Sequence, residues 1–249
     1  MSLGDAALLL VAGAGAGSVN AVAGGGSLLS FPALLATGYS PVTANVTNAI
    51  AVLPGYVGGS LAYREELRGQ RGRATRLGVS AALGGATGAI VLLSTPASAF
   101  DAIVPFLVAG ASLLLLAQPW LERRLGSRGD GEGRSVGVHV VQFAAAVYGG
   151  YFGAGLGIIL LAFHGLLLGG DLQRLNALKG MLSLIVSIAA AAVFVVAGPI
   201  AWGAAALVAA SAFAGGHLGV SVARRLSAEV LRWGVAAVGI AAAVALLVT

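Results

Sequence analysis

Long apolar segments, separated by short polar or glycine-rich stretches, dominate the chain. Most of them reach the roughly 20 apolar residues that one helical span of a bilayer requires, and two are shorter. The predicted segments are residues 5–23, 27–37, 41–62, 74–95, 99–120, 136–152, 157–169, 172–197, 200–222 and 229–248. This pattern predicts a polytopic α-helical membrane protein, because a helix satisfies its backbone hydrogen bonds internally.

The order of segments in the first half of the chain recurs in the second half. In each half, a helix pair interrupted by glycines precedes three longer segments. The stretch "GGGSLLSFPALLATG" from Gly24 aligns without a gap with "GLGIILLAFHGLLLG" from Gly155, which places Asn45 near Asn176. Such recurrence indicates an internal repeat. The expected units are a first transmembrane repeat at residues 1–121, a cytoplasmic linker at 122–135 and a second transmembrane repeat at 136–249.

Arginines orient the predicted spans. They gather at residues 64–76, 122–135 and 224–232, whereas the turns near Pro41 and Pro199 contain no Lys or Arg. By the positive-inside rule, the arginine-rich loops are cytoplasmic and both termini are external. The two halves then cross the membrane in opposite senses. We expect an all-α polytopic protein of two inverted-topology repeats, each a broken or short helix pair plus three full spans, in a bacterial-type cytoplasmic (inner) membrane.

Glycine clusters interrupt the first helix pair of each half. Non-helical backbone at membrane depth is tolerated only where protein buries it or where it lines a cavity. Inverted repeats with broken helices at matching positions are the architecture of secondary transporters, whose substrate sites lie at the breaks. The alternative is close helix packing through small residues, which needs no ligand.

Composition excludes several classes of function. Hydrophobic residues make up 58% of the chain and charged residues 9%, where a soluble domain carries about 25% charge. The absence of cysteine excludes disulfides, thiol catalysis and Cys-ligated metals. The net charge of +5 fits arginines in cytoplasmic loops rather than nucleic-acid binding. We expect no cofactor and no metal site, and no cleavable signal peptide, since the first apolar run lacks a basic segment before it.

Lys179 is the single lysine of the chain and lies about 12 Å into the segment 172–197. Ionisable residues inside membranes are costly and usually functional. No Asp or Glu lies in the apolar interior of a predicted span, so a buried lysine suits an incoming anion. The alternative is a lysine that extends to the cytoplasmic interface, where it pairs with Asp171.

Neutral donors complete the predicted site. Asn45, Thr47 and Asn48 follow Pro41 at a helix start, where free N–H groups and the helix dipole also favour anions. N-capping and hydrogen bonds between helices are the alternative role for these side chains. The predicted substrate-binding residues are Asn20, Gly24, Gly25, Gly26, Ser27, Asn45, Thr47, Asn48, Tyr151, Gly155, Asn176 and Lys179.

Two histidines are candidate proton carriers for coupled transport. His164 lies in the second short segment and His217 in the segment 200–222. Histidine changes charge near neutral pH, which suits this role. A histidine that only bonds a neighbouring helix is the equal alternative. Three scattered histidines without carboxylates make a poor metal site.

Two blocks of sequence resemble a known family. "FPALLATGYSPVTANVTNAIAVLPGYVGGSLAY" (Phe31 to Tyr63) resembles the first repeat of the sulfite exporter TauE/SafE family. "YGGYFGAGLGIILL" (Tyr148 to Leu161), together with "LNALKGMLSLIVS" from Leu175, resembles its second repeat, lysine included. The resemblance implies an inner-membrane transporter of small sulfur-containing anions, such as sulfite or organosulfonates, usually in the export direction. One departure is His164 and the lack of a proline in the second block, where the first has Pro32.

The leading hypothesis is therefore an anion transporter that works by alternating access and is not an enzyme. Its expected partners are a small anionic substrate, the lipid bilayer, a coupling proton and a second copy in a homodimer, with no nucleic acid. An anion channel for the same or carboxylate substrates is the alternative. A remote alternative is a rhomboid-like intramembrane serine protease, from "AGGHLG" at residues 214–219 and Ser112, although "GASLL" lacks the G-x-S-G of that family.

Overall fold

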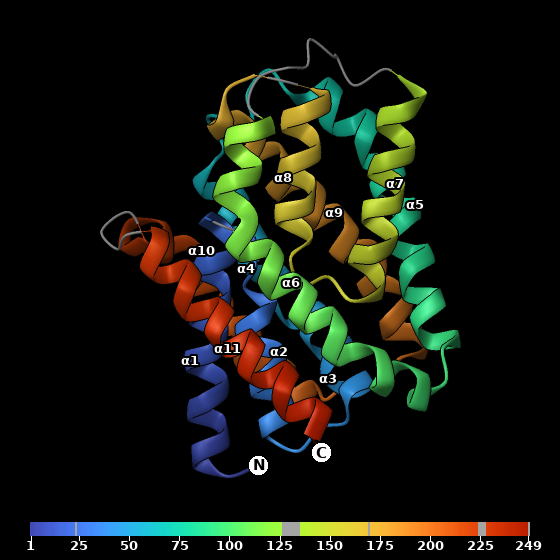
Figure 1. Ribbon diagram of the computed structural model, residues 1–249, viewed down its shortest axis with the longest axis vertical. Helices are drawn as coiled ribbons and strands as arrows, with labels where there is room; N and C mark the ends of the chain where they lie inside the picture. The colour runs from blue at the N-terminus through green and yellow to red at the C-terminus, as the bar shows by residue number, and fades with distance from the viewer. Residues whose placement is uncertain (23, 126–134, 169, 224–227, 249) are drawn as a thin grey trace.

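The chain folds into a bundle of α-helices (Figure 1). The computed structural model describes residues 1–22, 24–125, 135–168, 170–223 and 228–248. Within these residues there are eleven helices and no β-strand. They are α1 (Leu3–Val22), α2 (Ser27–Ala36), α3 (Pro41–Ala51), α4 (Leu53–Ala62), α5 (Arg71–Ser94), α6 (Ala97–Leu125), α7 (Val136–Tyr151), α8 (Leu156–Leu167), α9 (Leu172–Ala197), α10 (Trp202–Ala223) and α11 (Ala228–Val248). This confirms the all-α prediction.

Four helices within the described residues are long and apolar enough to cross a bilayer by length and composition. They are parts of α1, α5, α6 and α9, with bounds Leu3–Ala21, Arg71–Ser94, Ala97–Leu121 and Gln173–Ala197. The chain is therefore an integral membrane protein, as its hydropathy predicts. Of the expected linker at 122–135, residues 126–134 lie outside the described part of the chain, and α6 continues past the expected boundary to Leu125.

Local sequence explains where several helices begin. The Ser40 hydroxyl accepts a hydrogen bond from the N–H of Thr43, and Pro41 occupies the first turn of α3. The Asp171 carboxylate accepts from the N–H groups of Gln173 and Arg174, at 3.0 and 3.1 Å, and so caps α9. These caps place both helix starts where the apolar segments were predicted to begin.

The prediction of one continuous span over residues 41–62 is wrong. The structure divides this segment into α3 and α4, with a turn at Val52. Pro54 explains the division, because proline has no N–H to donate to the carbonyl four residues earlier and its ring crowds that carbonyl. The first half of the chain thus has a further helix break that α9, continuous over 26 residues, lacks.

Three pairs of helix starts in the two halves are offset by the same 131 residues, whereas α7 (136) against α1 (3) and α8 (156) against α2 (27) are offset by 133 and 129. α9 begins at 172 against 41 for α3, α10 at 202 against 71 for α5, and α11 at 228 against 97 for α6. The same offset relates Gly24 to Gly155, and both have positive φ angles, of +88° and +77°. The two halves therefore share the register of their helices as well as the order of their segments.

Helices of the two halves pack against each other. α1 lies along α10, α5 lies along α7 and α9, and α6 lies along α11. The close pairs are built on glycine: a Cβ at Gly17 of α1 would overlap the Ala212 carbonyl of α10, and one at Gly88 of α5 would overlap the Val147 carbonyl of α7. Small residues let helix backbones approach closely in membranes. Close packing is thus a role for many glycines of the chain.

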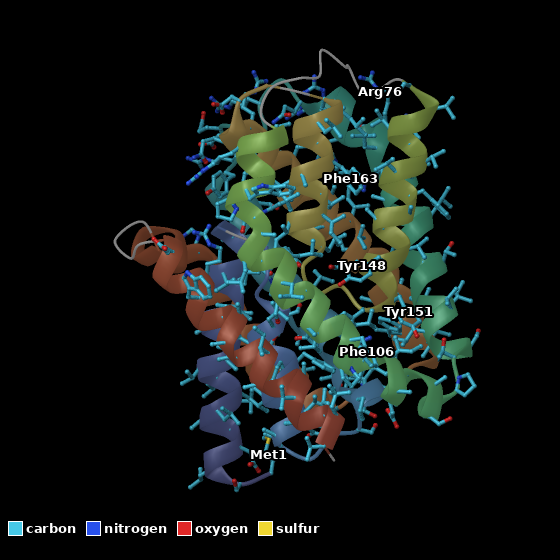
Figure 2. All side chains as sticks on the ribbon, in the orientation of Figure 1. Met1, Arg76, Phe106, Tyr148, Tyr151 and Phe163 are labelled. Carbon is cyan, nitrogen blue, oxygen red and sulfur yellow. The ribbon has the colours of Figure 1, made fainter. Side chains whose placement is uncertain are left out.

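Two hairpins enter the bundle from opposite ends (Figure 1). α1 rises from the end that holds both termini and α2 returns toward it, whereas α7 and α8 form a hairpin from the end where α6 finishes. In Figure 2, Met1 and Arg76 mark the two ends, and Tyr148 and Tyr151 mark the inner end of α7. The tips of both hairpins therefore lie inside the bundle. That both termini are external stays a prediction.

Candidate functional site

The two glycine breaks meet in the interior. A Cβ at Gly157 would lie 2.8 Å from the Cα of Gly24, so the two backbones are in direct contact. Gly24 has a φ of +88°, a conformation that side chains rarely tolerate. The breaks that precede α2 and α8, predicted to form one site, are thus adjacent. We call the contact of Gly24 with Gly157 the glycine junction.

Both short helices begin at this junction without a side-chain cap. α2 starts after Gly26 and α8 starts after Gly155, and neither glycine offers a side chain to the first N–H groups. Uncapped helix N-termini carry partial positive charge and favour anions. The junction therefore gathers two positive helix ends, one from each half of the chain.

Lys179 of α9 lies beside the glycine junction. Its side chain is only 1% exposed, and a Cβ at Gly157 would be 3.4 Å from its Cδ. A lysine that extends to the interface would be exposed, and the proposed partner Asp171 instead caps its own helix. The only lysine of the chain therefore adds a buried positive charge to the two helix ends.

A narrow cavity between α1, α4 and α9 holds two of the predicted amides. Its volume is about 10 Å³, room for about one water molecule, and Asn20, Ser60 and Asn176 are among its lining residues. Asn20 Oδ1 accepts from the N–H of Gly26 at 2.8 Å, which ties α1 to the first break. Within the described residues, Asn20 Nδ2, Asn176 Oδ1 and Ser60 Oγ are buried without a hydrogen-bond partner. Unpaired polar atoms around a cavity suit a polar ligand, since leaving them unmatched costs free energy.

The three candidate donors of α3 bond to other helices instead of facing this cavity. Asn45 Nδ2 donates to the carbonyl of Tyr151 at 2.8 Å, and Asn48 Oδ1 accepts from the Ser30 hydroxyl. Thr47 Oγ1 accepts from the N–H of Ala201 at 3.0 Å. These bonds correspond to the alternative role, hydrogen bonding between helices, and they hold α3 to the ends of α7 and α10.

Replacing Thr47 by valine is expected to lower the free energy of unfolding by about 1–2 kcal/mol, because the Ala201 N–H loses its acceptor at a buried site. Ligand affinity should stay unchanged, since the Thr47 oxygen is already engaged. Thermal unfolding of the purified variant, with and without ligand, measures both quantities. A large loss of ligand affinity at an unchanged free energy of unfolding would contradict this prediction and would indicate that Thr47 binds the ligand.

The remaining candidates surround the junction. Ser27 is the buried first residue of α2, and a Cβ at Gly25 would meet the side chain of Leu115. Tyr151 contributes its carbonyl to Asn45, and its ring lies 5.8 Å from that of Phe100, centroid to centroid. The contacts of Tyr151 are therefore a hydrogen bond to its backbone carbonyl and the packing of its ring.

Neither histidine lies at the Asn20–Asn176 cavity. His164 is buried between α7 and α8, where its Nε2 lies 3.0 Å from Gln142 Oε1. His217 is exposed on α10 and stacks on Phe213, with ring centroids 6.5 Å apart. His164 thus makes a hydrogen bond to the neighbouring helix α7, the role given above as the alternative to proton transfer.

The serine and histidine of the remote protease hypothesis lie in different surroundings, Ser112 buried between α6 and α11 and His217 exposed on α10. The Ser112 hydroxyl donates to the Val108 carbonyl of its own helix at 2.8 Å and packs against Gly239 of α11. His217 points outward from α10. A nucleophile needs its base within hydrogen-bond reach, and this arrangement does not supply one.

Sequence reasoning missed the contribution of α4. Ser60 lines the cavity, and Gly55 and Gly59 form part of its wall. The signal was present in "PGYVGGS", where a proline and three glycines interrupt an apolar segment. Ser183, one turn beyond Lys179, was also missed, and its buried hydroxyl has no partner in the described part of the chain.

Comparison with known proteins decides the family. The sequence model of the family described as "Sulfite exporter TauE/SafE" matches residues 9–246. The chain belongs to this family. The match covers both halves and both glycine breaks of this TauE/SafE protein, and confirms the resemblance of its two sequence blocks.

Curated relatives of this TauE/SafE protein are also named as transporters. A "Probable membrane transporter protein" of Haemophilus influenzae is 30% identical over 228 residues, which cover 87% of this chain and 84% of the relative. "Probable membrane transporter protein YfcA" of Escherichia coli K12 is 26% identical, over 82% of this chain and 75% of its own length. "Probable membrane transporter protein ORF9" of Sinorhizobium sp is 26% identical, over 97% and 92%. No solved structure matches. The family and these relatives support a membrane transporter.

Proposed function

We propose that this TauE/SafE protein is a secondary transporter, in the export direction, of small sulfur-containing anions such as sulfite or short sulfonates. The observation that carries the proposal is the burial of Lys179 at the glycine junction. No Asp or Glu accompanies it among the buried residues that the structure describes. A site with one lysine and two positive helix ends is complementary to a small anion. The preference for sulfur anions rests on the family description.

The proposed mechanism uses two repeats, residues 1–121 and 136–249, joined by the linker 122–135. The offset of 131 residues between three pairs of helix starts supports the repetition, and the entry of the two hairpins from opposite ends supports its inversion. In transporters of this architecture, one repeat rocks against the other around a central site. Lys179 and the helix ends hold the anion charge, and the unpaired Nδ2 of Asn20 donates to its oxygens. The arginine-rich end is the cytoplasmic side of the inner membrane.

Transport by reconstituted protein tests the proposal. Vesicles that contain the purified protein should move radiolabelled sulfite or a short sulfonate faster than empty vesicles, with a flux that saturates with concentration. Sulfate and short carboxylates belong in the same panel to define the substrate class. A single-channel current would favour the channel alternative, and the absence of flux for every anion would contradict the proposal.

The variant Asn20→Asp separates binding from folding. Aspartate keeps the oxygen that accepts from the N–H of Gly26, but it replaces the unpartnered Nδ2 donor with a second oxygen that repels anions. We expect anion affinity to fall at least about tenfold, the loss of one charge-assisted hydrogen bond, while the protein still folds. Anion-induced shifts in the thermal midpoint measure the affinity. Wild-type affinity in this variant would place the anion away from Asn20.

A further inference from the structure

An open groove lies between α4, α5 and α9 at the arginine-rich end of the molecule. Its volume is about 530 Å³, and Arg64, Arg68 and Arg71 contribute to its lining. Apolar side chains of α4 and α9, Leu61 and Met181 among them, form much of the rest. The groove is therefore a hollow with a basic rim, and it is separate from the glycine junction.

Ser60 lies in the wall between this groove and the interior. It lines both the groove and the narrow cavity that holds Asn20 and Asn176. Its buried hydroxyl has no hydrogen-bond partner within the described residues. An unpaired hydroxyl between the groove and the cavity is suited to form a hydrogen bond with a polar ligand.

The groove keeps a net positive charge. Glu65 pairs with both Arg64 and Arg68, at 3.6 and 2.8 Å, but all three side chains are more than half exposed. Exposed pairs contribute little and exchange readily with other ions. Arg71 adds a third positive charge, and the groove lining contains no acidic residue in the described chain. A cleft lined by one sign of charge concentrates ions of the opposite sign.

The arginine-bearing loop is held in place over the groove. The buried Gln70 amide donates to the carbonyls of Glu66 and Arg174, at 2.9 and 2.8 Å. Arg174 in turn donates to the carbonyl of Arg68 at 3.4 Å. These bonds join the loop between α4 and α5 to the start of α9, the helix that carries Asn176 and Lys179.

We infer that this groove is a second, outlying anion site, in which the arginines bind the anionic group before it passes Ser60 to the central cavity. The inference rests on the proposed function. It adds a step in which the groove captures the anion, and this step sets the apparent affinity of the transporter for the anion at the cytoplasmic end. The anionic head of a lipid has the same chemistry as a free anion. We assign the groove to the free anion, because Ser60 belongs to the linings of both the groove and the cavity.

The test compares Arg71→Gln with Arg123→Gln, which removes an equal charge from the exposed Arg123 near the end of α6, outside the groove lining. At low ionic strength, Arg71→Gln should raise KM for the transported anion about two- to fivefold at unchanged kcat, and added salt should remove the difference. Arg71→Lys should restore the wild-type KM, and Arg123→Gln should leave it unchanged.

The flux is measured in vesicles of phosphatidylcholine alone and in vesicles that also contain phosphatidylglycerol. An equal rise of KM in both supports capture of the free anion, whereas a rise confined to the anionic vesicles would assign the groove to a lipid head group and overturn the inference. Wild-type KM in Arg71→Gln, or equal effects of both glutamine variants, would also overturn it while the proposed function stands. Absence of flux in the wild type would remove both.

Discussion

Replacing Lys179 by methionine should lower the affinity for the transported anion by about 10- to 100-fold, the loss of a hydrogen bond to a charged group. Methionine keeps an unbranched apolar chain beside Gly157 and removes only the positive charge. The thermal midpoint without anion reports the effect of the substitution on stability, apart from its effect on binding. Thermal unfolding with and without sulfite, and flux in vesicles, measure the two effects.

Two further variants interpret this result. Lys179→Ala should lose both the anion response and some stability, since it removes the packed aliphatic stem as well as the charge. Ile188→Ala, on the same helix but half exposed and outside the cavity and groove linings, changes apolar volume without changing charge and serves as the control. If Lys179→Met bound the anion with wild-type affinity, the lysine would have no place in the site.

Replacing Gly157 by alanine should abolish transport and lower the free energy of unfolding by about 1–3 kcal/mol, the usual cost of overpacking. The new Cβ would lie 2.8 Å from the Cα of Gly24, and no side-chain rotation can relieve a contact with backbone. The two breaks must therefore separate, which displaces the helix ends and Lys179 from one another. Flux and the thermal midpoint measure the effect.

The matched control is Gly110→Ala in α6. A Cβ at Gly110 meets nothing within 4 Å, so alanine should be tolerated and should stabilise the helix by up to about 1 kcal/mol. Gly24→Ala should be at least as damaging as Gly157→Ala, since it adds the strain of a side chain at a φ of +88°. Wild-type stability and flux in Gly157→Ala would show that the glycine junction is dispensable.

Much of the architecture was predictable because it depends on local properties of the chain. Apolar length and capping residues identify helices such as α5 and α9 whatever they pack against, and the segments at 74–95 and 172–197 agree closely with them. The repeated order of segments and the similar lengths of the two halves follow from the same hydropathy pattern. The exception is the segment 41–62. Its hydropathy predicted one span, although Pro54 is a residue that interrupts helices.

The candidate site was only partly predictable. Asn20, Asn176 and Lys179 could be selected because polar groups are rare and costly in apolar segments. Whether such a group faces a cavity or another helix depends on residues distant in the chain. Asn45 was selected on the same grounds as Asn176, yet its amide is bonded to Tyr151, 106 residues away. His217 looked equivalent to His164, yet it lies on the outer surface of α10.

The sequence by itself determined that this chain is an all-helical membrane transporter of the TauE/SafE family with glycine breaks at matching positions in its two halves. Hydrophobic length, helix-breaking residues and family resemblance are properties of contiguous sequence. Only the tertiary structure decided that Gly24 touches Gly157, that Lys179 lies against that contact, and that Ser60 lines both the basic groove and the cavity. These are contacts between segments far apart in the chain, and they arise from the packing of whole helices, which no local pattern specifies.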